Sequence, residues 1–222
     1  MTKKTKALLR RTTGIFCLGG ILLAAGSFTS CSEDKDTVEE YSDWQAKNEA
    51  YWNSLYTATQ QKIKNGDTSW RTILNYTFQN QKNDSKTPST YGPEDYIIVH
   101  VEQIGTGTKS PIYTDSVRYH CRGRLIPSTT YTQGFVFEES WKGTKNNTQI
   151  STPFQFKVST RVDGLSTALQ NMHTGDRWIV YVPYTLGNGI RYKKNIPAYS
   201  TLIYDITLIE IYHANDLIKP FM

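Results

Sequence analysis

The sequence predicts an α+β fold in which a curved antiparallel β-sheet wraps over one short helix, behind an N-terminal helical segment. The helix is predicted over residues 162–175, where four apolar residues recur at i, i+3, i+4 and i+7: Leu165, Ala168, Leu169 and Met172. Segments on both sides alternate with period two, as in 177–182 and 200–212, which is typical of strands. A sheet that clasps a helix leaves an apolar hollow at one end, where a ligand can bind.

Residues 1–30 have the pattern of a secretory signal peptide. A basic start precedes an apolar run from Gly14 to Phe28, which is too short and too glycine-rich for a membrane span. The run ends before Cys31 in a sequence that resembles lipoprotein signals, which are cleaved before an acylated cysteine. We therefore expect lipid on Cys31 and a tether over 31–37. We expect this anchor to be the only membrane contact and to hold the protein in the cell envelope. Ser32 favours the outer membrane, on either its periplasmic or its surface face.

Charge and cysteine usage narrow the functional classes. The chain has 25 Lys and Arg against 20 Asp and Glu, but five of the basic residues lie in the signal. In the rest of the chain the basic and acidic residues are equal in number, which gives no support for nucleic-acid binding. With Cys17 in the signal and Cys31 acylated, Cys121 is left alone, so no intramolecular disulfide is expected. The four histidines lack metal-ligand spacing, and no nucleotide motif occurs, so we expect no metal and no cofactor.

The region in front of the sheet is predicted as a helical segment over 38–78 and a linker over 79–94. An aromatic stripe along 38–64 indicates a helix, and Asn65-Gly66 is a good stop. We expect this aromatic stripe to pack on its own domain rather than to bind a sugar or a partner protein. Dimerisation through the helix is a weaker alternative, so the oligomeric state stays open. Residues 70–78 fit a strand or a second short helix. The linker is rich in Asn, Ser, Thr and Lys.

The main domain is predicted over 95–213, with a tail over 214–222. Strands are expected, by their apolar and β-branched content, over 96–104, 115–126, 135–141, 154–158, 177–182 and 200–212. Asp163 is expected to cap the helix between the fourth and fifth strands, and Gly175 to close it. This order gives an antiparallel sheet with one helix inserted.

Several segments, in the same order, resemble motifs of one protein family. Residues 120–125, His-Cys-Arg-Gly-Arg-Leu, are similar to its His-Tyr-x-Gly-x-Leu, and residues 137–140 to its Phe-Asp-Ser-Ser. Residues 153–156 resemble its Pro-Phe-x-Phe, residues 162–175 its Val-Ile-x-Gly-Trp-x-x-Ala-Leu-x-x-Met-x-x-Gly helix, and residues 196–206 its Ile-Pro-Pro…Ser-Thr-Leu-Ile-Phe-Asp-Val ending. The family is that of the FKBP-type peptidyl-prolyl cis-trans isomerases. The resemblance covers about three fifths of the chain after the signal.

The resemblance implies an aromatic and aliphatic pocket for proline. Carried over by match, the catalytic positions are Cys121, Phe137, Glu138 and Tyr204, and the substrate-binding positions are Phe154, Val162, Leu165, Asn188 and Ile196. Three positions of the pocket depart from the family. Cys121 stands in place of a tyrosine, and Leu165 in place of a tryptophan. A second tyrosine of the family is replaced in the loop around Asn188. These losses imply weakened catalysis and weak binding of macrolide inhibitors. The aromatic residues would also suit an ordinary strand core, which is the alternative for each of them taken singly.

The implied function is peptidyl-prolyl cis-trans isomerase or folding helper, acting on proline-containing polypeptide clients among exported proteins. Such a reaction needs no nucleophile, metal or proton relay. The alternative is a non-catalytic FKBP-fold module of the cell envelope that binds a protein or ligand. A thiol nucleophile is disfavoured, because His120 and Cys121 are neighbours on a strand and point to opposite faces.

Overall fold

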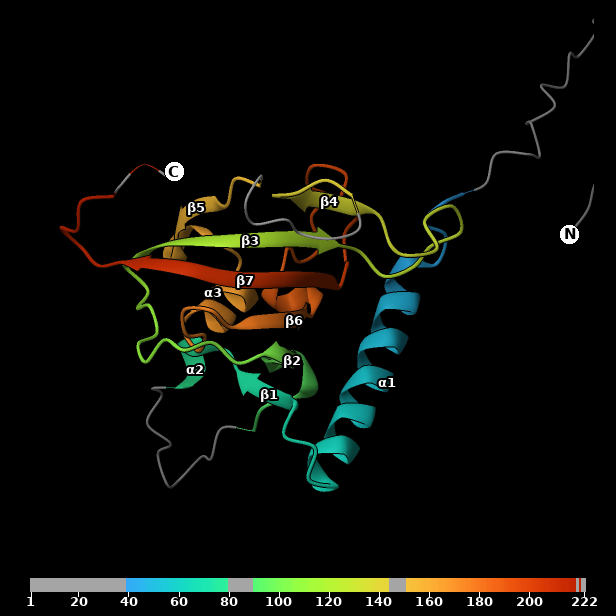
Figure 1. Cartoon of the computed structure of the whole chain (residues 1–222). Helices are drawn as coiled ribbons and strands as arrows, with labels where there is room; N and C mark the ends of the chain where they lie inside the picture. The colour runs from blue at the N-terminus through green and yellow to red at the C-terminus, as the bar shows by residue number, and fades with distance from the viewer. Residues whose placement is uncertain (1–38, 80–89, 144–150, 219, 221–222) are drawn as a thin grey trace, which may run out of the picture. The chain divides into compact units, whose positions relative to one another are not determined.

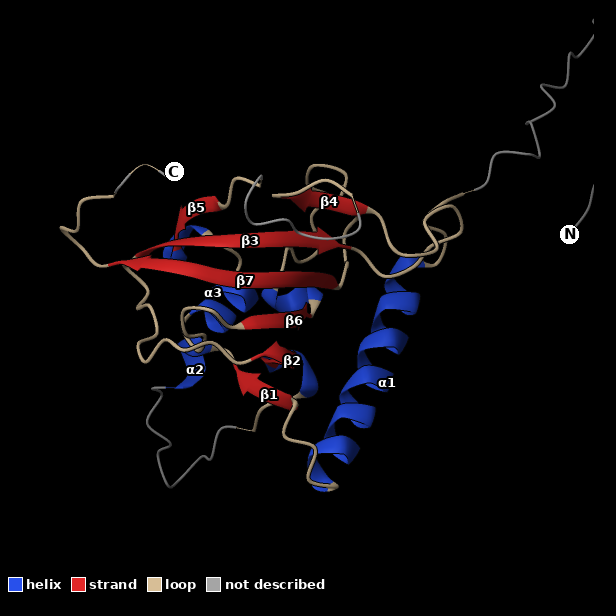
Figure 2. Ribbon diagram, in the orientation of Figure 1, coloured by secondary structure: helices blue, strands red, loops and turns tan. Residues whose placement is uncertain are grey.

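The computed structural model describes residues 39–79, 90–143, 151–218 and 220. Within them, a seven-stranded antiparallel sheet curves around the short helix α3, as the sequence predicts (Figure 1, Figure 2). The strand order is β1-β2-β6-β7-β3-β4, and β5 pairs with β3 beside β4. The strands are β1 (Trp70–Leu74), β2 (Tyr96–Gln103), β3 (Ser116–Arg124), β4 (Val136–Glu139), β5 (Phe154–Lys157), β6 (Arg177–Val182) and β7 (Leu202–Tyr212). The helices are α1 (Trp44–Lys64), α2 (Tyr76–Gln79) and α3 (Asp163–Leu169), with 3₁₀ turns η1 (Pro93–Asp95), η2 (Val158–Thr160) and η3 (Tyr184–Leu186).

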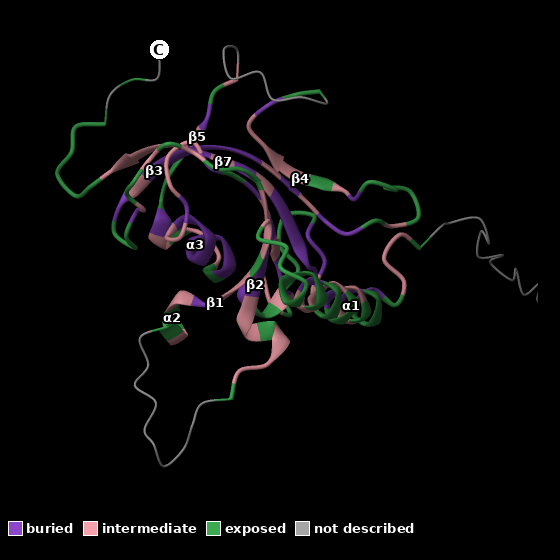
Figure 3. Ribbon diagram, turned by 60° about the horizontal axis from the view of Figure 1, so that its bottom comes forward, coloured by how far each residue is buried: buried purple, intermediate pink, exposed green. Residues whose placement is uncertain are grey.

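The core lies between the concave face of the sheet and α3, which is buried from Gly164 to Leu169 (Figure 3). Gly164 lets the helix approach the sheet, since a Cβ there would lie 2.3 Å from the Val182 side chain. Residues on the predicted stripe, Leu165, Leu169 and Met172 among them, have no exposed surface. Full burial of such a side chain contributes about 1.5–3 kcal/mol, so this face holds the sheet and helix together.

Both ends of α3 differ from the prediction. Asp163 is its first residue rather than its cap; Val162 is the N-cap, without a side-chain hydrogen bond. The helix ends at Leu169 and is followed by turns at residues 170–171 and 174–175. Gly175 lies in the last of these with φ +91°, and its N–H donates to the Leu208 carbonyl. It therefore leads the chain into β6 rather than closing the helix.

The N-terminal segment is part of this fold. The predicted helix over 38–64 is found as α1, and Asn65 ends it. Trp44 belongs to the core, and its indole N–H donates to Ser200 Oγ over 2.8 Å. The Asn48 side chain accepts from the Thr201 N–H over 2.7 Å. The aromatic stripe therefore packs on its own domain.

Residues 70–78 contain both elements that the sequence left open, strand β1 and then the first residues of α2. All five residues of β1 pair with β2, so the sheet extends beyond the predicted domain start at residue 95. Among the described residues, α1 contributes Trp44 to the same core as strands β2–β7, and β1 belongs to the same sheet. The physical reason for the pairing of β1 is that β2 would otherwise expose an unpaired edge.

The predicted signal (1–30) and tether (31–37), with Cys31, lie outside the described residues, as does most of the linker predicted over 79–94. In the described part of the chain, no helix is both long and apolar enough to span a bilayer.

Candidate active site

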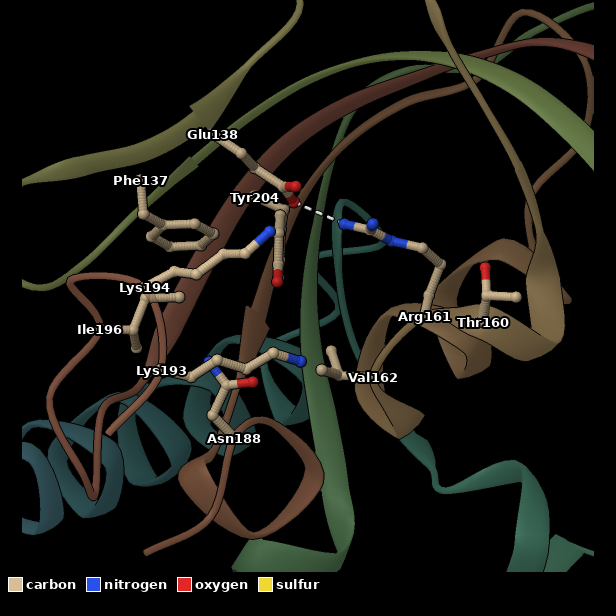
Figure 4. A pocket seen from close by; sticks show the side chains of 10 residues that line it. All are labelled: Phe137, Glu138, Thr160, Arg161, Val162, Asn188, Lys193, Lys194, Ile196 and Tyr204. Carbon is tan, nitrogen blue, oxygen red and sulfur yellow. Dashed lines mark hydrogen bonds and ion pairs between the residues drawn. The ribbon is translucent and has the colours of Figure 1, made fainter. Parts of the chain in front are cut away.

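A hollow opens at the end of the sheet where β7 begins, beside the start of α3 (Figure 4). Its wall combines aliphatic and aromatic side chains with a few charged ones. The lining residues are Phe137, Glu138, Thr160, Arg161, Val162, Asn188, Lys193, Lys194, Ile196 and Tyr204. They come from β4, from the η2–α3 junction, from the loop between β6 and β7, and from β7 itself.

Gly123 fixes how the strands meet at the hollow. On β3 it pairs with Glu138 of β4 on one side and with Tyr204 of β7 on the other. A Cβ at this position would lie 2.5 Å from the Phe137 ring and 3.0 Å from that of Tyr204. The missing side chain therefore lets both rings settle onto β3, where they pack edge-to-face with centroids 5.6 Å apart.

An ion pair crosses one side of the hollow. Arg161, between η2 and α3, donates to Glu138 Oε1 over 2.6 Å. The Arg161 guanidinium also lies over the Phe156 ring, 4.8 Å from its centroid. Both charged side chains are largely covered, at 15% and 24% exposure, so breaking this pair would leave a poorly solvated charge.

Tyr204 brings a phenol into the hollow. The residue is only 3% exposed, and its hydroxyl points toward the centre of the site (Figure 4). Burial raises the pKa of Tyr204 well above its ordinary value, so the group stays protonated and can donate a hydrogen bond. No residue of the described chain accepts a hydrogen bond from this hydroxyl. It is therefore available to a ligand.

A tight hairpin turn forms the opposite rim. Lys193 and Ile196 exchange two backbone hydrogen bonds of 3.0 and 2.9 Å. The residues between them, Lys194 and Asn195, have φ values of 45° and 66°, which is the pattern of a two-residue primed turn. The turn buries Ile196 in the wall and presents both lysine side chains at the mouth.

The structure brings six of the nine proposed site residues together in the lining: Phe137, Glu138, Val162, Asn188, Ile196 and Tyr204. The other three lie elsewhere. Cys121 on β3 and Leu165 on α3 have no exposed surface and belong to the core. Phe154 on β5 packs edge-to-face on Tyr119, beside that core.

Four lining residues were missed from the sequence: Thr160, Arg161, Lys193 and Lys194. Arg161 directly precedes Val162, so its place in the chain was a usable signal. The two lysines carried none, because their position depends on the hairpin turn.

Proton-transfer and thiol chemistry find no support at this site. Burial raises the pKa of the Cys121 thiol well above its usual range, so thiolate is disfavoured. Burial lowers the pKa of His120, whose Nδ1 lies 3.2 Å from Ser140 Oγ rather than near Cys121 Sγ. No cluster of potential metal ligands occurs among the described residues. The arrangement suits binding of an apolar group, with a donor hydroxyl inside and cations around it.

Comparison with known proteins shows what the region around the site is similar to. Residues 107–209 match the family model described as FKBP-type peptidyl-prolyl cis-trans isomerase. The chain is similar to a macrophage infectivity potentiator of Trypanosoma cruzi, with 34% identity over 48% of each chain. It is 31% identical to the FKBP-type 22 kDa peptidyl-prolyl cis-trans isomerase of Escherichia coli, over 46% of this chain and 43% of the relative. The outer membrane protein MIP of Legionella longbeachae is 36% identical, over 48% and 40%.

The matched stretch spans less than half the length of each of these relatives. Residues 107–209 include strands β3 to β6, most of β7, helix α3 and all the residues that line the hollow. The region that carries the candidate site therefore matches the model of the FKBP-type peptidyl-prolyl cis-trans isomerase family.

Proposed function

We propose that this protein is a peptidyl-prolyl cis-trans isomerase that acts on X–Pro bonds of exported polypeptides. The observation that carries the proposal is the hollow itself, an apolar wall with one unpaired phenol inside it. Phe137, Val162 and Ile196 form the apolar part and Tyr204 supplies the donor. The relative named as a peptidyl-prolyl cis-trans isomerase and the matching family model support the same activity.

The chemistry fits this site. Rotation about an X–Pro bond faces a barrier of about 18–20 kcal/mol, and the uncatalysed step takes tens to hundreds of seconds. Amide resonance weakens when the bond leaves water for an apolar wall and twists. A donor placed for the twisted form then lowers the barrier further, because it binds the transition state better than the ground state. The buried Tyr204 hydroxyl is the donor that we assign to this role.

We propose that the activity is weaker than is usual in the family. The positions of two expected pocket side chains, Cys121 and Leu165, hold small or aliphatic residues that lie in the core instead of the lining. The wall therefore lacks one phenol and one indole. Macrolide inhibitors, which need a deep aromatic pocket, should bind weakly for the same reason.

The site would work at the cell envelope. The proposed lipid on Cys31 would hold it at the outer membrane, and a relative named an outer membrane protein supports this location. Proline-containing segments of newly exported chains are then the clients within reach.

The test is isomerisation of a Leu-Pro tetrapeptide by the purified protein. NMR exchange spectroscopy measures the rate, so that no protease is needed. Acceleration above the uncatalysed rate that Tyr204→Phe reduces is the expected result. Peptide binding without acceleration would instead support the alternative of a non-catalytic binding module.

A further inference from the structure

Two lysine side chains reach over the mouth of the hollow. In Figure 4 the amine of Lys194 points toward Tyr204 and that of Lys193 toward Val162. Both belong to the hairpin turn that ends at Ile196, and both residues are exposed. The turn is closed by two hydrogen bonds, so it holds the two amines on the same rim.

The charges in the lining do not balance. Of the four charged residues, Glu138 is already bound by Arg161 over 2.6 Å. No carboxylate in the described chain lies within salt-bridge distance of Lys193 or Lys194. The lining therefore carries a formal excess of two positive charges at its open side.

The position of Lys193 and Lys194 favours a role in ligand binding over a role in stabilising the fold. The backbone at Lys194 has φ 45°, an unfavourable conformation for a lysine. The same turn places Ile196 in the apolar wall, so a proline held against Ile196 and Val162 would have its neighbouring residue beside the amines. A cationic rim attracts anionic ligands and repels cationic ones.

We propose that the hollow selects proline segments in which Asp or Glu stands directly next to the proline. This inference rests on the proposed isomerase function and names its preferred substrate class. The carboxylate would pair with Lys193 and Lys194, while the proline ring contacts the apolar wall. Exposed ion pairs contribute modestly, so we expect a preference of about threefold to tenfold over a neutral peptide of the same shape.

The experiment compares matched peptides with Glu, Gln, Leu or Lys before the proline, and a second set with the same residues after it. NMR titration of the purified protein gives Kd and exchange spectroscopy gives kcat/KM. We expect Glu to exceed Gln by the stated factor in one set, and Lys to bind least well. The Glu advantage should shrink as salt rises, because the Debye length falls from about 10 Å at 0.1 M to about 3 Å at 1 M.

The double variant Lys193→Gln with Lys194→Gln should abolish the Glu-over-Gln difference. The double variant Lys64→Gln with Lys109→Gln is the charge-matched control, since both lysines are exposed and neither lines the hollow. Equal affinities for the Glu and Gln peptides in both sets would overturn the inference, even if the Leu peptide is turned over. Absence of turnover for every peptide would refute the proposed function alone, because the Kd values would still decide the charge preference.

Discussion

Tyr204→Phe is the sharpest test of the site, because it removes one atom from the hollow and little else. The Tyr204 ring would keep its edge-to-face packing on Phe137, and its burial would not change. The hydroxyl has no acceptor in the described part of the chain, so the free protein loses no known hydrogen bond. The unfolding free energy should therefore stay within about 0.5 kcal/mol of the native value.

Activity should respond differently. In the complex, the missing donor leaves a buried acceptor of the peptide unpaired, which costs about 1–3 kcal/mol. At 1.4 kcal/mol per factor of ten, kcat/KM should fall by about 5- to 150-fold. A hydroxyl that bonds mainly to the twisted amide lowers kcat and kcat/KM together, whereas one that bonds equally to the ground state raises KM only.

Steady-state exchange kinetics on a Leu-Pro peptide and a urea melt provide the two measurements. Tyr181→Phe serves as the matched control, since Tyr181 lies on β6 outside the lining and should change neither value. Unchanged kcat/KM in Tyr204→Phe would show that the hydroxyl does not contact the reacting bond. A loss of more than about 1 kcal/mol of unfolding free energy would show that its role is structural.

Four further outcomes are expected. Leu169→Ala should cost about 2–5 kcal/mol in a denaturant melt, because Leu169 has no exposed surface, while half-buried Gln170→Ala should cost about 0.5 kcal/mol; equal losses would contradict the packing of α3. Trp44→Ala should cost about 3–5 kcal/mol, and a change below about 1 kcal/mol would mean that α1 is energetically separate. Cys121→Tyr should cost about 1–3 kcal/mol through overpacking and yet raise kcat/KM; no rise would exclude the lost phenol as the cause of weak activity. Cys31→Ala should abolish labelling with a fatty acid, and full labelling of the variant would exclude acylation there.

Local pattern was enough to predict most of the sheet. Alternation over 177–182 matches β6 residue for residue, because every second side chain there is buried against α3 or its neighbours. The docking of α1 was only partly predictable. Its aromatic stripe indicated a buried face, but no periodicity reveals that Trp44 would reach Ser200, 156 residues away. The pairing of β1 with β2 is equally non-local, since it spans the predicted linker.

The site shows the same limit. Phe137, Val162 and Tyr204 could be named because each stands in a motif that resembles the family. Arg161 could not, because its role depends on the Glu138 carboxylate, which comes from another strand. The rim lysines depend on a two-residue turn whose second position, Asn195, tolerates positive φ while Lys194 does so poorly. The spacing of residues along the chain does not predict which of these side chains lie close together in the fold.

The loss of one pocket phenol at Cys121 is accompanied by tyrosines at nearby positions. Tyr119 precedes Cys121 by two on β3, so both side chains lie on the same face of the strand. Its hydroxyl is buried without a partner among the described residues, and burial raises its pKa well above the ordinary value. Tyr204 carries a hydroxyl where the resembling motif has phenylalanine. A buried unpaired hydroxyl costs stability, so the Tyr204 hydroxyl, which lines the hollow, favours a role in binding over one in packing. Tyr204 therefore supplies the phenol of the hollow, whereas Tyr119 lies in the core outside the lining.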